Sequence, residues 1–137
     1  MRFPTLAKQH IHRPIVAVHI QASVGRWLSI DALVDTGSDV SLFPESLARR
    51  LALDLRGVSP TPLTSALGTL ATYRPVELVL ELRRFPDVLR WKTTVGFLDR
   101  PMTYGLLGTK GFFEFFTMHY DARGHLFEIK PAGDLPQ

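Results

Sequence analysis

One short motif in this chain combines the residue types that proton chemistry needs. The tetrapeptide Asp35-Thr36-Gly37-Ser38 directly follows the apolar run Ala32-Leu33-Val34. The run predicts a buried strand, so the Asp35 carboxylate is expected at a strand end, in a turn that needs a glycine and has hydroxyl groups on both sides. The motif occurs once. A mechanism that uses two such aspartates would therefore have to take the second one from another chain.

By itself the motif is a weak signal, because aspartate and glycine both favour ordinary hairpin turns. Its context gives it more weight. A strand is predicted directly before it, and a second apolar segment with glycines, Gly105-Leu106-Leu107-Gly108, follows later in the chain. The alternative, a small β-rich protein in which Asp-Thr-Gly is accidental, stays open at this point.

Alternating and β-branched segments predict a mostly β chain around the motif. Segment 59–75 has a tip of small residues between arms that contain proline, which predicts a hairpin projecting from the body. Short helices are expected after Pro44, because proline is tolerated at the first helical position, and over 109–116. The expected strands are 14–20, 27–34, 40–43, 76–82 and 91–98, with a closing hairpin of 117–120 and 125–130.

Composition limits the classes of function. With 137 residues, of which 45% are hydrophobic and 21% charged, the chain fits one folded domain. The absence of cysteine excludes disulfides and thiolate metal sites. No apolar stretch is long enough to span a bilayer, and residues 1–8 contain no apolar signal segment, so we expect no membrane partner and a cytoplasmic protein. The net charge of +3 comes from scattered arginines and gives no basis for binding nucleic acid.

Other chemistries find little support in the sequence. His10 and His12 alternate as in some metal sites, but no third ligand lies within sequence reach, so no metal is expected. Neither Ser41 nor Ser46 lies in the Gly-x-Ser-x-Gly elbow of a serine hydrolase. A phosphate loop and a dinucleotide fingerprint are also absent from the sequence. We therefore expect no cofactor.

The order of these parts resembles the retropepsin-type aspartic proteases. In that family a strand leads into Asp-Thr-Gly-(Ser/Ala), a flap hairpin follows, and a segment of two hydrophobic residues and glycine, here Leu106-Leu107-Gly108, enters a short helix. The segment from Arg13 to Ile20 also resembles the opening strand of the retroviral enzymes. The resemblance covers roughly residues 12–130. It implies a closed β-barrel of the acid protease fold with one or two short helices, in a domain of residues 12–131 between a flexible leader, 1–11, and a tail, 132–137.

The resemblance implies a role for each residue of the motif. Asp35 would be the catalytic carboxylate, paired with Asp35 of a second subunit in a homodimer. Two carboxylates this close share one proton and can activate a water against a peptide bond, and aspartic proteases are the standard example of such a pair. Thr36 would join the two loops across the dimer, Gly37 would let the backbone turn beside the substrate, and the Ser38 hydroxyl would donate to Asp35.

The resemblance also implies a flap, an ion pair and a substrate groove. Arg13 and Asp39 match the family's ion pair between subunits. After Gly108 the family usually has arginine and then asparagine or aspartate, whereas this chain has Thr109-Lys110-Gly111, which leaves Lys110 as the candidate replacement. The expected flap tip consists of Ala66, Leu67 and Gly68, and the expected pocket walls are Leu33, Leu67, Val95, Leu106 and Leu107.

Two functions follow as hypotheses. The first is an aspartic endopeptidase that acts as a homodimer on an extended peptide or protein substrate. The second is a peptide-binding or dimerisation module of the same fold with little or no proteolysis, motivated by the altered Thr109-Lys110-Gly111 segment and by a flap with few glycines.

Overall fold

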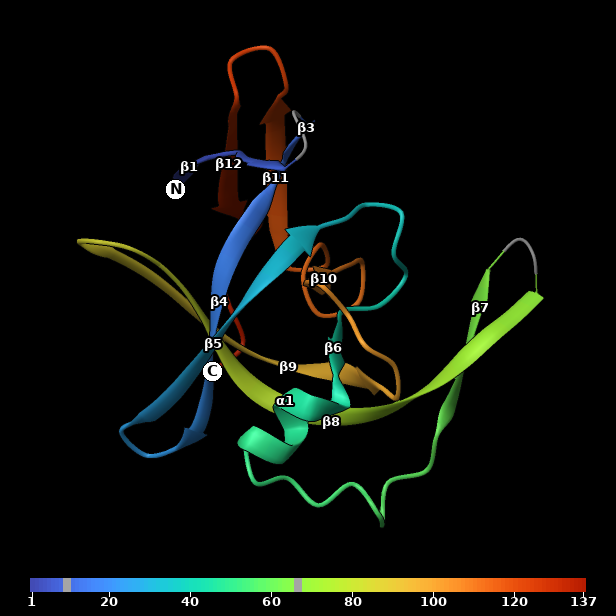
Figure 1. Ribbon diagram of the computed structural model, residues 1–137. Coiled ribbons are helices and arrows are strands. Elements are labelled where there is room, and N and C mark those ends of the chain that lie inside the picture. The colour runs from blue at the N-terminus through green and yellow to red at the C-terminus, as the bar shows by residue number, and fades with distance from the viewer. Residues whose placement is uncertain (9–10, 66–67) are drawn as a thin grey trace.

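The computed structural model describes residues 1–8, 11–65 and 68–137, and its centre is a closed β-barrel (Figure 1). The barrel closes because β8 pairs with β9 on one side and with β4 on the other. In order around the barrel, the six strands are β4 (Ile15–Ser23), β5 (Arg26–Val34), β10 (Gly105–Leu107), β6 (Leu42–Pro44), β9 (Asp87–Leu98) and β8 (Gly68–Arg84). The predicted mostly β barrel is confirmed.

The barrel is filled by every second residue of its strands, as expected for strands with one buried face. In β9 this pattern buries Trp91, Val95 and Phe97. The Trp91 indole Nε1 donates to the carbonyl of Gly111 at 2.9 Å, so its polar atom is satisfied in the core. Further core residues from the other strands and from α1 are Val18, Ile20, Ala32, Val34, Phe43, Leu47, Leu80, Leu82 and Leu107.

The short strand β10 lies between β5 and β6 and joins them. Leu106 is opposite Leu33 of β5 in a parallel pairing and opposite Leu42 of β6 in an antiparallel pairing. The predicted apolar segment with glycines therefore forms a strand directly beside the strand that leads into Asp35.

The hairpin predicted over 59–75 is present. It consists of β7 (Thr61–Ser65) and the first part of β8, and it projects from the barrel at the right of Figure 1. Gly68 begins β8 with φ +103°, a backbone conformation that favours glycine. The other two residues of the expected flap tip, Ala66 and Leu67, lie outside the described residues.

The first predicted helix is confirmed as α1 (Glu45–Arg50). Pro44 precedes it, Glu45 lies in its first turn, and two arginines lie in its last turn, which suits the helix dipole. Leu47 and Ala48 are buried against the barrel. The described part of the chain contains no helix of the length and apolarity that crossing a membrane requires.

The second predicted helix is wrong. Residues 109–115 form hydrogen-bonded turns and isolated bridges, and the Phe115 and Phe116 amides both donate to the carbonyl of Phe112. Gly111 has φ +96°, which a helix does not allow. In addition, Lys110 uses its N–H and C=O groups to pair with the loop after Asp35, so these groups are not available for helical hydrogen bonds.

Residues 1–8, which belong to the expected leader of residues 1–11, include two short strands. Strand β1 (Arg2–Pro4) pairs with β12 (Leu126–Pro131), which also pairs with β11 (Phe116–Asp121). Phe3 is only 6% exposed, and its ring stacks on Phe127 with 5.2 Å between ring centroids. A second hairpin of β2 (Leu6–Lys8) and β3 (Ile11–Arg13) follows. The buried Phe3 ring and the pairing of β1 with β12 both hold this segment against the sheet.

The C-terminal residues also contact the barrel. The Lys92 amide donates to the carbonyl of Pro136 at 2.8 Å, and Gln137 Nε2 donates to the carbonyl of Arg90 at 2.8 Å. Both terminal segments therefore contact the folded body, and the expected domain bounds of 12–131 stay a prediction.

We expect Phe3→Ala to lower the free energy of unfolding by about 3 kcal/mol, because it removes a buried ring from the junction of β1 and β12. Urea unfolding measures this change. Phe85→Ala is the matched control, since Phe85 is 80% exposed and its loss should change stability by less than about 0.5 kcal/mol. Equal effects of the two substitutions would contradict the assignment of β1 to the folded core.

Candidate active site

Asp35 lies at the end of β5, in the turn where the sequence places it. Its N–H donates to the carbonyl of Leu107 in β10 at 2.9 Å, and its Oδ1 accepts the Gly37 N–H at 2.8 Å. The side chain is half-buried, and Thr36 and Gly37 beside it are exposed. A Cβ atom at Gly37 would lie 3.2 Å from Asp35 Oδ1, so glycine gives the carboxylate its space. The strand and the turn together hold an accessible carboxylate in a defined position.

The loop after Asp35 is held by main-chain hydrogen bonds to the segment after β10. The Thr109 amide donates to the carbonyl of Ser38, and the Lys110 amide donates to the carbonyl of Asp39, both at 2.9 Å. In the other direction the Ser41 amide donates to the carbonyl of Lys110 at 2.9 Å. We call residues 35–41 the catalytic loop, since Asp35 is the candidate catalytic residue, and we call residues 108–114 the supporting turn.

Gly108 is required by the close approach of these two segments. A Cβ atom at this position would lie 2.5 Å from the carbonyl oxygens of both Ser38 and Val40. Such distances exclude any side chain unless the catalytic loop moves. The glycine of the predicted apolar segment therefore determines how closely the supporting turn packs under the loop.

Ser41 is a residue of this site that the sequence analysis did not identify. Its side chain is 1% exposed, its Oγ accepts the Gly108 N–H at 3.0 Å, and its hydroxyl donates to the carbonyl of Lys110 at 2.9 Å. One hydroxyl thus connects the catalytic loop to both ends of the Gly108–Lys110 segment. The available signal was a single polar residue among the apolar residues Val40, Leu42 and Phe43, since a buried polar group needs partners.

The expected contact of Ser38 with Asp35 is wrong within the chain. The Ser38 hydroxyl donates to the carbonyl of Val40 at 2.6 Å. The donor to the Asp35 carboxylate is the Gly37 amide, because the tight turn brings this N–H to the carboxylate first. Ser38 therefore supports the loop backbone.

Among the expected pocket walls, Leu33 and Leu106 lie beside Asp35 and Val95 lines a cavity next to the loop, whereas Leu107 belongs to the core alone. Leu33 and Leu106 are half-buried neighbours in the pairing of β5 with β10. Val95 is 1% exposed and Leu107 is 0% exposed, and both belong to the barrel core. The alternation of side chains along a strand explains the error, because Leu107 must face the opposite side from Leu106. Leu67 lies outside the described residues.

Arg13 and Asp39 are both exposed. Among the described residues of one chain, neither residue takes part in an ion pair. The predicted pair joins two subunits, so it stays a prediction. For the same part of the chain, no group of three or more histidine and carboxylate side chains could hold a metal ion.

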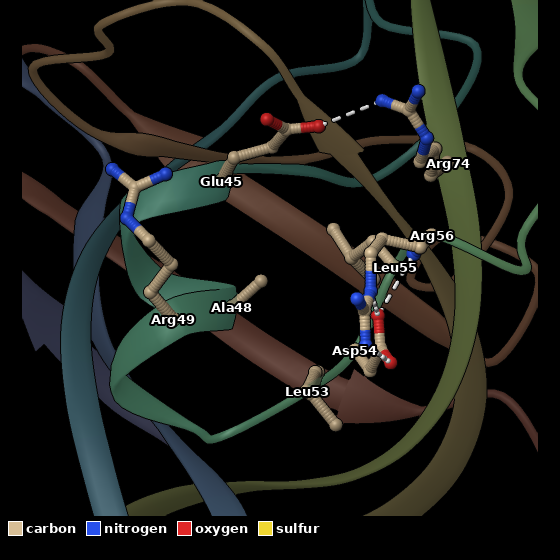
Figure 2. Close-up of a pocket in the computed structure, with 8 residues that line it drawn as sticks. All are labelled: Glu45, Ala48, Arg49, Leu53, Asp54, Leu55, Arg56 and Arg74. Carbon is tan, nitrogen blue, oxygen red and sulfur yellow. Dashed lines mark hydrogen bonds and ion pairs between the residues drawn. The ribbon is translucent and has the colours of Figure 1, made fainter.

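The structure contains a cavity of about 320 Å³ away from Asp35, between α1, the loop that follows it and β8 (Figure 2). Its charged groups are largely paired with each other. Glu45 Oε1 lies 2.9 Å from Arg74 Nη1, and Asp54 Oδ2 lies 2.8 Å from Arg56 Nη2 (Figure 2). None of its lining residues belongs to the catalytic loop, so this cavity is not the candidate active site.

A second cavity, of about 300 Å³, adjoins the catalytic loop. Its walls come from the loop, from β8 at the base of the flap, from β9 and from the supporting turn. The lining residues are Val40, Ser41, Tyr73, Pro75, Thr93, Thr94, Val95, Gly96, Lys110 and Glu114.

The most strongly paired carboxylate lies elsewhere, on β8 beyond the flap. Glu81 is 3% exposed, and it accepts hydrogen bonds at 2.7 Å from Arg83 Nε and Arg90 Nε. Both guanidinium groups lie over the Trp27 ring. Burial by itself raises the pKa of the Glu81 carboxyl, but the two arginines outweigh it and lower the pKa below its usual value. The pKa of the neighbouring His19 is lowered by burial and by Arg83.

A six-stranded barrel with an accessible aspartate at a strand end, held by a glycine-containing turn from a neighbouring strand, defines the class of the acid proteases. Residues 20–110, more than half of the chain, match the family described as aspartyl protease. The chain belongs to the aspartyl protease family.

Two solved structures are similar to the chain. A retropepsin-like aspartic protease from Rickettsia conorii matches with a TM-score of 0.65 and 14% sequence identity, over 94% of this chain and 90% of the other. The EIAV protease in complex with the inhibitor HBY-793 matches with a TM-score of 0.46 and 20% identity, over 76% and 88% of the two chains. No curated protein matches the chain at a significant level. The R. conorii structure supports the retropepsin-like fold that the resemblance implies.

We expect Ser41→Ala to lower the free energy of unfolding by about 1–3 kcal/mol, because the buried Gly108 amide loses its acceptor and Lys110 loses a donor. Urea unfolding measures the change. Ser46→Ala on the exposed surface of α1 is the matched control and should leave stability within about 0.5 kcal/mol of the wild type. If Ser41→Ala were as stable as this control, the connecting role of the Ser41 hydroxyl would be wrong.

Glu81 predicts a dependence of stability on pH. Since its pKa is lowered in the folded protein, its contribution is complete above the unfolded pKa of about 4.3 and is lost as the pH falls through the folded pKa. Glu81→Gln should therefore be less stable than the wild type at pH 7, and the difference should shrink towards pH 3. Urea unfolding at both pH values measures it. Glu77→Gln, in an exposed pair with Lys92, should show little difference at either pH. A constant deficit for Glu81→Gln would contradict the account.

Proposed function

We propose that this protein is an aspartic endopeptidase that acts as a homodimer, with one Asp35 from each subunit. The observation that carries the proposal is the Asp35 carboxylate itself, which is half-buried, held by the Gly37 amide, and provided once per chain. A two-fold axis is the simplest way to turn one motif into a pair, because it places the same loop of both subunits face to face. The exposed Thr36 and Gly37 leave the loop accessible for this contact.

The reaction needs two carboxylates that share one proton. The ionised Asp35 would take a proton from a water molecule as the water attacks the carbonyl carbon of the scissile peptide bond. The protonated Asp35 would give its proton to the carbonyl oxygen, and proton transfer to the amide nitrogen would then release the amine product. Two carboxylates within hydrogen-bonding distance cannot both ionise, which provides the two protonation states from one residue type.

The substrate is an extended peptide that lies between the catalytic loop and the flap. β7 and β8 offer main-chain groups for β-type hydrogen bonds. The flap tip of Ala66, Leu67 and Gly68 would close over the peptide and exclude water. Leu33 and Leu106 present partly exposed apolar surface beside Asp35, so we expect apolar side chains on either side of the cut.

Contacts between subunits complete the proposed site. The Thr36 hydroxyl would join the two catalytic loops, and Arg13 of one subunit would pair with Asp39 of the other. These groups are exposed in the single chain, where they can meet a second copy.

The altered Thr109-Lys110-Gly111 segment gives little support to an inactive binding module. The amides of Thr109 and Lys110 hold the catalytic loop through main-chain hydrogen bonds. Main-chain groups are present whatever side chain occupies these positions. The departure from the family pattern therefore does not remove the support of Asp35.

A subunit-mixing experiment tests the proposal. Asp35→Asn alone should abolish peptide cleavage and leave the mass of the dimer unchanged. When wild-type chains exchange subunits with an equal amount of Asp35→Asn chains, about one quarter of the dimers contain two wild-type subunits, so activity per wild-type chain should fall to about half. Mixing with Asp134→Asn, an exposed aspartate in the C-terminal segment, should leave activity per total chain unchanged, because these chains keep their own Asp35.

Three results would contradict the proposal in different ways. Cleavage by Asp35→Asn at the wild-type rate would exclude Asp35 as the catalytic group. Unchanged activity per wild-type chain after mixing would show that one chain suffices. Tight binding of peptides by the wild type without any cleavage would favour the binding module.

A further inference from the structure

We propose that the cavity beside the catalytic loop is a specificity pocket that selects a side-chain amide, glutamine or asparagine, in the peptide substrate. Lys110 and Glu114 on its wall would recognise the amide oxygen and the amide nitrogen. The inference rests on the proposed function, because it concerns the peptide that passes Asp35.

The cavity adjoins both the loop that carries Asp35 and the base of the flap, between which the proposed function places that peptide. Val40 and Ser41 on its wall belong to the catalytic loop, and Tyr73 and Pro75 belong to β8 where the flap leaves the barrel. A peptide that lies extended between loop and flap directs every second side chain towards the same face. The cavity, about 300 Å³ in volume, has room for such a side chain.

The walls of the cavity are held rigidly by the contacts that support Asp35. The main chain of Lys110 pairs with Asp39 on one side and with Ser41 on the other. Glu114 Oε1 accepts the Gly111 N–H at 2.7 Å, and the Glu114 amide donates to the carbonyl of Thr109 at 3.1 Å. A pocket whose walls are already ordered loses less entropy when a ligand binds.

The opposite wall is closed by an aromatic ring. A Cβ atom at Gly96 would lie 2.5 Å from Cδ2 of Tyr73, so the Tyr73 ring packs directly on the backbone of β9. Only glycine at position 96 allows this contact. The ring and Pro75 therefore form the wall next to the flap.

The charges decide which side chain fits best. Among the described residues, neither Lys110 nor Glu114 takes part in an ion pair. A carboxylate in the pocket would be attracted by Lys110 and repelled by Glu114, and an ammonium group would experience the reverse. An amide accepts a hydrogen bond from the lysine and donates one to the carboxylate. An apolar side chain would desolvate both charged groups without pairing either.

The two-fold symmetry of a homodimer predicts how this selection should appear among the substrate positions. A homodimer has two copies of the pocket, one on each side of the shared dyad. The preference for an amide should therefore appear at two substrate positions, one before and one after the cut.

Cleavage of a positional series of peptides tests the inference. One peptide sequence is varied at a single position at a time, on either side of the cut. At each position Gln, Glu, Lys and Leu are compared by the kcat/KM of cleavage. We expect Gln to be preferred by about tenfold at one position on each side of the cut, the size of effect that unpaired polar groups in a substrate site readily produce. At the remaining substrate positions, the ranking of the four side chains by kcat/KM should be different.

Two variants test whether Lys110 and Glu114 cause the preference for an amide side chain. Lys110→Met should raise the relative kcat/KM for Lys at the selective positions, because only the carboxylate remains. Glu114→Gln should raise the relative kcat/KM for Glu at the same positions, because only the lysine charge remains. The amide oxygen of the new side chain can still accept the Gly111 N–H. Lys130→Met on β12, away from the cavity, is the matched control and should leave all ratios unchanged.

The outcomes separate this inference from the proposed function. Cleavage that depends on Asp35 but shows no amide preference, or a preference that neither variant shifts, overturns the pocket and leaves the endopeptidase intact. If no peptide is cleaved, the proposed function fails, and binding of the same peptides to Asp35→Asn, followed by fluorescence anisotropy, still decides the pocket. Binding in which Gln is not favoured, or no binding at all, overturns it.

Discussion

The structure depends on the close packing of two short segments, the catalytic loop and the supporting turn. Gly108 approaches the carbonyl groups of Ser38 and Val40 so closely that no side chain fits. The Ser41 hydroxyl then connects to the amide of Gly108 and the carbonyl of Lys110. Because the two segments come from strands that pair in the barrel, the position of Asp35 is determined by the barrel itself.

In this arrangement, the groups that hold the catalytic loop in place differ from the groups that we propose to recognise the substrate. The hydrogen bonds that hold the catalytic loop come from main-chain groups and one buried hydroxyl. The side chains of Thr109 and Lys110 are exposed and take no part in those bonds. The side chains at positions 109 and 110 can therefore depart from the usual family pattern without removing these hydrogen bonds, and Lys110 is available for the selection of substrate that we propose.

Features with local causes could be predicted from the sequence. The position of Asp35 follows from an apolar run that ends in a turn motif, and α1 follows from Pro44 and Glu45 before an apolar pair. The closed barrel follows from the resemblance, which rests on the order of motifs along the whole chain.

Features that depend on distant partners could not be predicted. The role of Ser41 exists only because β10 inserts between β5 and β6, and the pairing of β1 depends on Phe127, which is far away in sequence. The missing second helix has the same cause, since Lys110 pairs with the catalytic loop in place of its own neighbours. Leu107 was expected in a pocket wall but lies in the core, because side chains alternate along β10 and Leu106 takes the side beside Asp35.

The central claim is that two copies of Asp35 form one active site. A crystal structure of the assembled protein tests it most directly, through the distance between the two Asp35 carboxylates. The account predicts an approach to hydrogen-bonding distance, about 2.5–3.0 Å between oxygens, across a two-fold axis. Asp35 carboxylates that remain far apart in every assembly of the protein would contradict it.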